Sequence, residues 1–168
     1  DLVVPLARVA AEEGCPVALV GTTEASLRGA ARRLEAEGVR IAAAISPSPG
    51  FDPHSDEATR LIEPLGESGA SVCFLAMGAP RQEMFAARAA QVLPGTGFAS
   101  IGAGIDFLSG HQIRAPQIVR SMALEWAWRL SQDPGRLAGH YARCALALPP
   151  LAIAAMASRA RTRAQRTL

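Results

Sequence analysis

The segment Met77-Gly78-Ala79-Pro80-Arg81-Gln82-Glu83 holds the first group of side chains that could do chemistry. It follows an apolar run and opens a helical pattern. Its backbone N–H groups are therefore predicted to form an anion site for a diphosphate or a sugar. Simple helix capping is the alternative, because Glu83 would lie in the first helical turn, where a carboxylate stabilises the helix dipole, and Gln82 would then only be solvated.

A second candidate segment is Gly102-Ala103-Gly104-Ile105-Asp106, which follows another apolar run. Its glycines allow close approach of the backbone to a ligand, and the Asp106 carboxylate could accept hydrogen bonds from a nucleoside base or a ribose. The third glycine and the following helix of a dinucleotide-binding fingerprint are absent, so an NAD site is a poor fit. The alternative for Asp106 is a turn-capping aspartate.

The third group consists of arginines near the C-terminus, chiefly Arg114, Arg129 and Arg136. A guanidinium fork can bind phosphate oxygens through two parallel hydrogen bonds, which makes these residues candidates for contact with a diphosphate. The alternative is that each is an ordinary solvated surface arginine.

The distribution of charge separates the two ends of the chain. All 17 basic residues are arginines, and residues 1–110 hold eight of them against thirteen acidic residues. Residues 111–168 hold nine arginines against only Glu125 and Asp133. This asymmetry indicates an anionic partner near the C-terminus, and nucleic acid, anionic lipid and diphosphate are all open on this evidence.

Histidine and cysteine are too scattered for a metal site or a nucleophilic triad. The histidines are His54, His111 and His140, and the cysteines are Cys15, Cys73 and Cys144. No metal-ligand spacing occurs, so no metal is predicted, and a hydrolase built on a protein nucleophile is disfavoured. The cysteines lie in apolar stretches and are expected to be small buried hydrophobic residues.

The elements that must position these segments alternate between helix and strand. Helices are predicted at 1–13, 24–38, 56–67 and 81–92, and strands at 16–21, 39–46, 71–78 and 98–104. Thr22 and Thr23 are both expected to cap the second helix. The alternation predicts an α/β fold with an open, mainly parallel, Rossmann-like sheet that has helices on both faces. Ligands of such sheets bind beyond the carboxyl ends of the strands, here at 21–24, 77–83 and 102–110.

The pattern changes to helices alone from residue 117, which divides the chain into a sheet domain at 1–110 and an all-helical appendage at 111–168. The run ALALPPLAIAAMA is too short and too broken by proline to span a bilayer. The apolar helix that begins after the two prolines of this run could lie in a membrane interface with its arginines on the headgroups, or pack in a core with a solvated tail. Its arginines are Arg159, Arg161, Arg163 and Arg166.

Taken together and in this order, four motifs resemble the WecG/TagA/CpsF glycosyltransferases. They are GAPRQE, GAGIDFLSG, RAP followed by LEWAWRL, and a D-P-x-R segment. The similarity covers nearly the whole chain and is strongest over residues 74–137. The resemblance implies an inverting, metal-independent transfer of an N-acetylmannosamine-type sugar from a UDP-sugar to undecaprenyl-diphosphate-linked N-acetylglucosamine. Such a reaction serves the synthesis of cell-surface polysaccharide or teichoic acid.

The resemblance also implies partners, a location and residue roles. It implies no cofactor beyond the UDP-sugar donor and no nucleic-acid partner. It also implies a cytoplasmic protein that contacts the inner face of the cell membrane through its C-terminal helices. Gln82 would lie in the active-site pocket, and Arg114, Arg129 and Arg136 would meet the acceptor diphosphate. The residues expected to bind the nucleotide or the sugar are Gly21, Gly78, Pro80, Arg81, Glu83, Gly102, Gly104 and Asp106.

Two departures from the family pattern qualify these expectations. Gly139 stands where a further arginine of the appendage is expected. The general base of the family is expected upstream of Asp1, which would make the chain N-terminally incomplete or a degenerate relative, inactive by itself. The alternative function is that of a non-catalytic fragment that binds a nucleotide-sugar or a lipid diphosphate. The donor sugar, the polysaccharide pathway and the oligomeric state, a homo-oligomer included, are left open.

Overall fold

The structure is a computed structural model. The chain forms two compact units, Asp1–Ile113 and Arg114–Leu168. The structure describes residues 2–112 and, beyond them, residues 116, 119, 122, 124–132, 134, 135, 139, 142, 146, 149, 150 and 155. In the second unit the helix α7 spans Glu125–Gln132. The C-terminal arginine cluster predicted to touch a membrane lies outside the described residues.

Four parallel strands form the sheet of the first unit. They are β1 (Val17–Gly21), β2 (Ile41–Ile45), β3 (Val72–Ala76) and β4 (Gly97–Ser100). Their order in the sheet is β2-β1-β3-β4, and all three neighbouring pairs are parallel. Every residue of the central strand β1 is buried, which explains why its sequence is a continuous apolar run.

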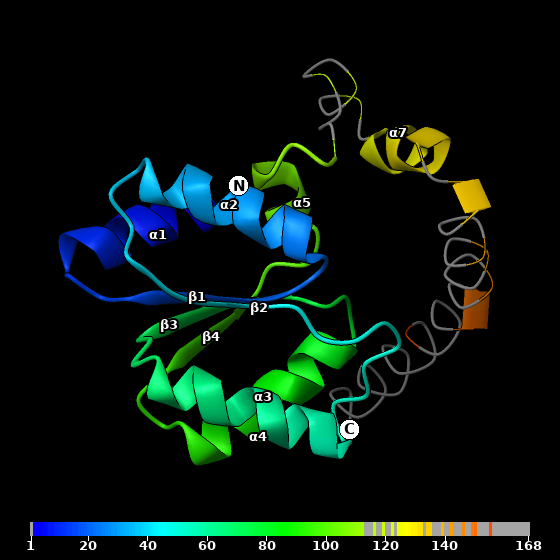
Figure 1. The fold of residues 1–168 in the computed structure, drawn as a ribbon. Coiled ribbons are helices and arrows are strands. Elements are labelled where there is room, and N and C mark those ends of the chain that lie inside the picture. The colour runs from blue at the N-terminus through cyan, green and yellow to red at the C-terminus, as the bar shows by residue number, and fades with distance from the viewer. Residues whose placement is uncertain are drawn as a thin grey trace, which may run out of the picture. The chain divides into compact units, whose positions relative to one another are not determined.

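Helices cover both faces of this sheet, as the sequence predicts. Figure 1 shows α1 (Val3–Glu12), α2 (Glu24–Glu35) and α5 (Gly104–Leu108) on one face. The opposite face carries α3 (Asp56–Glu67) and α4 (Arg81–Val92). The predicted α/β class with an open parallel sheet is therefore confirmed.

Successive side chains of the central strands point to opposite faces of the sheet and pack into two separate cores. Leu19 and Phe74 pack into the cluster under α1 and α2. Their chain neighbours Val20 and Leu75 pack into the cluster under α3 and α4. This alternation follows from the twofold side-chain period of a strand, so the two central strands anchor both helical layers at once.

Two predictions about local structure need correction. The strand expected at 98–104 ends at Ser100, and helix α5 begins at Gly104, so a short helix does follow this glycine-containing turn. Thr23 caps α2, because its Oγ1 accepts a hydrogen bond from the N–H of Ser26 over 3.2 Å. Thr22 does not cap that helix; its hydroxyl bonds to a residue that is distant in the sequence.

Candidate functional site

The order of the strands places a topological switch point between β1 and β3. The chain leaves β1 for β2 on one side, then returns through α3 to add β3 on the other side of β1. The helices of these two connections therefore lie on opposite faces of the sheet. Ligands of open α/β sheets bind at the carboxyl ends of the two strands that flank such a point. Here those ends are Gly21 and Ala76, which are partners in the β1–β3 register.

Gly21 is required by the approach of these two strands. Its φ is +124°, and a Cβ built on it would lie 2.5 Å from the carbonyl carbon of Ala76. No side chain fits at that distance, so the sheet itself explains this glycine. The predicted contact of Gly21 with a nucleotide stays a prediction.

Asp106 is tied to the end of β1 by a hydrogen bond across the sheet edge. The Oγ1 of Thr22 donates to the Oδ1 of Asp106 over 2.6 Å. Strands β1 and β4 are not neighbours, so the segment after β4 must cross the end of β3 to make this contact. Turn capping alone therefore does not account for Asp106, because its carboxylate accepts a hydrogen bond from a segment that is distant in the sequence.

Gln82 is buried at the first turn of α4, directly after the switch-point strand β3. It is 6% exposed, and its Nε2 donates to the Oε1 of Glu83 over 2.8 Å. The opposite orientation of the amide would place its oxygen against the carboxylate, so this hydrogen bond fixes the orientation. The Oε1 of Gln82 then has no partner among the described residues. The alternative of a solvated Gln82 is wrong.

The turn before α4 exposes the remaining residues of the GAPRQE motif. Gly78 has φ +76°, and a Cβ built on it would lie 4.0 Å from the Nη2 of Arg81. The guanidinium of Arg81 thus lies over this turn. Pro80, Arg81 and Glu83 are exposed, and α4 has no side-chain cap at Pro80. The capping alternative is met in part, because Glu83 lies in the first turn of α4 as that alternative expects, although no side chain caps the helix at Pro80.

The two glycines before Asp106 differ in their surroundings. Gly102 has φ +53°, and a Cβ built there would meet no atom within 4 Å. Gly104 is buried, and its Cβ would lie 3.1 Å from the Cγ2 of Val3 in α1. Gly104 therefore has a packing role under α1, and of these two only Gly102 lies open at the turn.

Several predicted residues cannot be placed. Arg114 and Arg136 lie outside the described residues, and Arg129 is described only as part of the backbone of α7. Thr22 lies in the loop predicted at this edge, but its contact with Asp106 was not predicted, and Ser46 was not predicted to belong to the edge at all. The Oγ of Ser46 donates to the backbone carbonyl of Thr22 over 2.8 Å. The available signal was their position at the carboxyl ends of predicted strands, with Thr22 directly after the strand at 16–21 and Ser46 as the last residue of the strand at 39–46.

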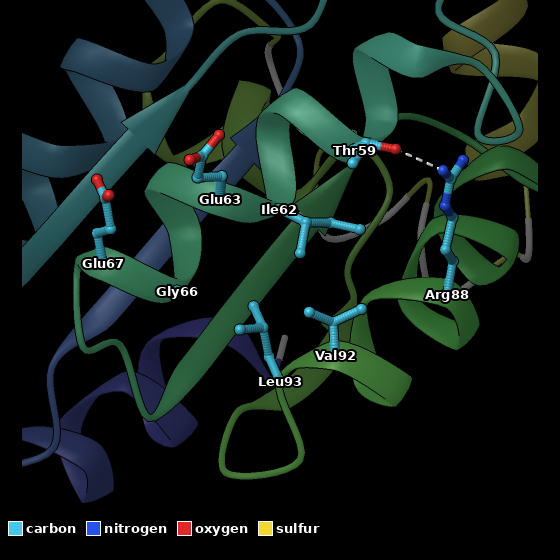
Figure 2. A pocket seen from close by; sticks show the side chains of 8 residues that line it. All are labelled: Thr59, Ile62, Glu63, Gly66, Glu67, Arg88, Val92 and Leu93. Atoms are coloured by element: carbon cyan, nitrogen blue, oxygen red, sulfur yellow. Dashed lines mark hydrogen bonds between the residues drawn. The ribbon is translucent and has the colours of Figure 1, made fainter.

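A groove lies elsewhere, between α3 and α4 (Figure 2), with a volume of about 460 Å³. The guanidinium of Arg88 at its rim is already engaged by the carbonyl oxygens of Pro53 and Ser55, at 2.9 and 3.1 Å. It also donates to the Oγ1 of Thr59 over 2.6 Å. Glu67 and Leu93 line the end of the groove where the chain turns back toward β3 and β4. The groove therefore extends toward the amino ends of the strands, away from the switch point.

Within the described part of the chain, no three His, Cys, Asp or Glu side chains gather so that they could hold a metal ion. No helix there has the length and apolar character needed to cross a bilayer. Cys73 is buried, and burial raises the pKa of its thiol to about 12. Cys15 is only half-buried, which corrects the expectation for that residue, and Cys144 is not described.

A comparison with protein families adds the identity that geometry alone does not supply. The Glycosyl transferase WecG/TagA/CpsF family matches residues 1–165, which is nearly the full length of both units. The motif residues around Gln82 and Asp106 fall within this match and lie at or next to the carboxyl edge of the sheet. The chain belongs to the WecG/TagA/CpsF family of glycosyltransferases.

Proposed function

We propose that this chain binds a UDP-sugar at the switch point between β1 and β3 and takes part in the inverting transfer of an N-acetylmannosamine-type sugar. The observation that carries the proposal is the buried Oε1 of Gln82, which lacks a donor among the described residues. A buried acceptor left unsatisfied costs about 1–3 kcal/mol. A sugar hydroxyl or an N-acetyl N–H would supply the missing hydrogen bond.

The neighbouring groups match the other parts of a nucleotide-sugar. The carboxylate of Asp106 can accept hydrogen bonds from ribose hydroxyls or from a base N–H. Arg81 lies over the turn at Gly78, at the N-terminus of α4, where a diphosphate is stabilised by the guanidinium and by the positive end of the helix dipole. Glu83 acts on the sugar through Gln82, whose amide it orients.

The reaction is a displacement at the anomeric carbon of the donor sugar. The acceptor hydroxyl oxygen attacks from the face opposite the diphosphate, the bond from the anomeric carbon to the phosphate oxygen breaks, and UDP leaves. The hydroxyl proton passes to a general base. Arg81 and the N-terminus of α4 stabilise the negative charge that develops on the leaving diphosphate. We assign the base to no described residue.

The second unit is proposed to bind the acceptor, undecaprenyl-diphosphate-linked N-acetylglucosamine, at the inner face of the cell membrane. The support is the excess of arginine in residues 111–168, which suits a diphosphate and an anionic lipid surface. Arg114, Arg129 and Arg136 are proposed to contact the diphosphate. The donor requires UDP, and no further cofactor is proposed.

Isothermal titration with UDP tests the donor site directly, with UMP and ADP as comparison ligands. The proposal expects saturable binding that prefers UDP to UMP, because the second phosphate meets Arg81 and the N-terminus of α4. It also expects a preference for UDP over ADP. Equal weak binding of all three, lost in parallel as salt rises, would instead indicate a generic cationic surface. A UDP-release assay with a lipid-diphosphate acceptor analogue then separates a transferase from a non-catalytic binding fragment.

A further inference from the structure

We infer that Thr22 is a positioning residue that holds the carboxylate of Asp106 in place for the nucleotide. The inference rests on the proposed function, in which Asp106 accepts hydrogen bonds from the nucleoside. Thr22 makes no proposed contact with the substrate, so its effect passes through Asp106.

The geometry of the contact leaves one carboxylate oxygen for a ligand. Thr22 and Asp106 are 84 residues apart in the sequence, and the Oγ1 of Thr22 donates to Oδ1 of the carboxylate over 2.6 Å. Within the described part of the chain, no residue donates to Oδ2. A carboxylate that is held by one oxygen loses less side-chain freedom when its other oxygen binds a ligand, and this improves affinity.

The backbone of Thr22 adopts a conformation that is unfavourable for a threonine. Thr22 has φ +52° and is the one non-glycine residue with positive φ among those that the structure describes. A β-branched side chain is disfavoured in this region, whereas glycine adopts it readily. Glycine would thus be the better residue for the turn alone. The side chain that is present supplies the hydrogen bond to Asp106.

A second hydrogen bond stabilises the same left-handed conformation. The Oγ of Ser46, directly after β2, donates to the backbone carbonyl of Thr22 over 2.8 Å. Thr22 therefore joins the ends of β1 and β2 to the segment that follows β4. The bond from Ser46 fixes the backbone of Thr22, and this holds the Thr22 hydroxyl where it bonds to the carboxylate of Asp106.

The test measures UDP affinity by isothermal titration and melting temperature for three variants of Thr22. Thr22→Val keeps the shape and the β-branch but removes the donor, and is expected to weaken UDP binding by about fivefold to tenfold. Thr22→Ser restores a hydroxyl and should stay within about twofold of the wild-type affinity. Thr22→Gly should weaken UDP binding like the valine variant while its melting temperature stays level or rises.

A matched control is the adjacent Thr23→Val. Thr23 caps α2 and makes no contact with Asp106, so its loss should lower the melting temperature and leave UDP affinity unchanged. In an Asp106→Ala background, Thr22→Val should have no further effect on UDP affinity, because the group that it positions is gone.

The outcomes separate this inference from the proposed function. If the wild-type chain binds UDP and Thr22→Val binds it equally tightly, only the inference fails. If both Thr22→Val and Thr22→Gly lose stability and affinity together, Thr22 is a structural residue and the inference also fails. If the wild-type chain does not bind UDP, the proposed donor site is wrong, and the inference about Thr22 is wrong as well.

Discussion

Gln82 and Glu83 are adjacent on α4 but lie in opposite environments, and one hydrogen bond joins them. The buried amide of Gln82 donates from Nε2 to the exposed carboxylate of Glu83 over 2.8 Å. The exposed residue therefore orients the buried one and leaves its Oε1 without a donor among the described residues. A binding role for Gln82 is proposed on the basis of this unpaired oxygen, and the alternative is a packing role.

Replacing Gln82 with alanine should weaken binding of the donor without destabilising the fold. The lost hydrogen bond to the sugar is expected to lower the affinity for the UDP-sugar by roughly tenfold. The free energy of unfolding should stay level or rise, because a buried unsatisfied acceptor is removed. Titration with the UDP-sugar and urea unfolding measure the two effects.

The matched control is Gln91→Ala, which changes an exposed glutamine on the last turn of the same helix. It should alter neither affinity nor stability. A large loss of stability in Gln82→Ala with unchanged affinity would assign Gln82 to packing.

Arg88 is predicted to be structural. Its guanidinium joins α4 to the segment before α3 and to Thr59 through three hydrogen bonds. Arg88→Ala should therefore reduce the free energy of unfolding by about 1–3 kcal/mol. UDP affinity should not change, because the groove that Arg88 lines leads away from the switch point. Urea unfolding beside a UDP titration checks this, with the exposed Arg60→Ala as control; a loss of UDP affinity in folded Arg88→Ala protein would contradict it.

Glu37 should make stability depend on pH in the acid range. The hydrogen bond from Arg8 lowers the pKa of Glu37 below its ordinary value of 4.5; burial opposes this, and the charges of Arg8 and Arg33 add to it. A depressed folded-state pKa gives stability that is present above the unfolded pKa. That stability is lost as the pH falls through the lower, folded value.

Thermal melts of Glu37→Gln and the wild type test this dependence at low salt. The variant should melt at a lower temperature at pH 7, and the difference should shrink toward zero near pH 3. Glu35→Gln is the control, because Glu35 is exposed and forms no ion pair with another described residue. A difference between Glu37→Gln and the wild type that is constant from pH 7 to pH 3 would show that the ion pairs do not cause it.

The arginines of the second unit should divide into two kinds if the proposed roles are correct. Replacing Arg159, Arg161, Arg163 and Arg166 together with glutamine should release the protein from anionic liposomes, since each contributes about 1 kcal/mol near such a surface. Turnover with a soluble acceptor analogue should persist. Changing Arg129 or Arg136 to alanine should instead cut that turnover and leave liposome binding near normal.

Liposome sedimentation and a UDP-release assay on the soluble analogue measure the two properties separately. If both sets of changes only weaken liposome binding, the second unit is an electrostatic anchor and the proposed contact with the acceptor diphosphate is wrong.

Local patterns in the sequence determined the alternating elements and their approximate bounds. The predicted helices at 56–67 and 81–92 match α3 and α4, because apolar periodicity is a local pattern that acts within a few residues. The strand predicted at 98–104 was too long. The apolar residues continue through Ile101 to Ile105, and a short apolar run does not distinguish a strand from a helix.

The burial of Gln82 was partly visible in the sequence. It shares one face of α4 with Phe85 and Ala89, at the spacing of a buried stripe. A polar residue in that stripe indicates either a satisfied core amide or a ligand contact. Only the tertiary structure shows that Nε2 is satisfied and that Oε1 is not.

The contact between Thr22 and Asp106 was decided by tertiary structure alone. The two residues are 84 positions apart, and strand order determines whether the segment after β4 reaches the end of β1. Strand order depends on how both helical layers pack on the sheet at the same time, and no local pattern encodes it. The sequence by itself therefore determined the motifs, and the packing of the sheet determined which of their side chains meet.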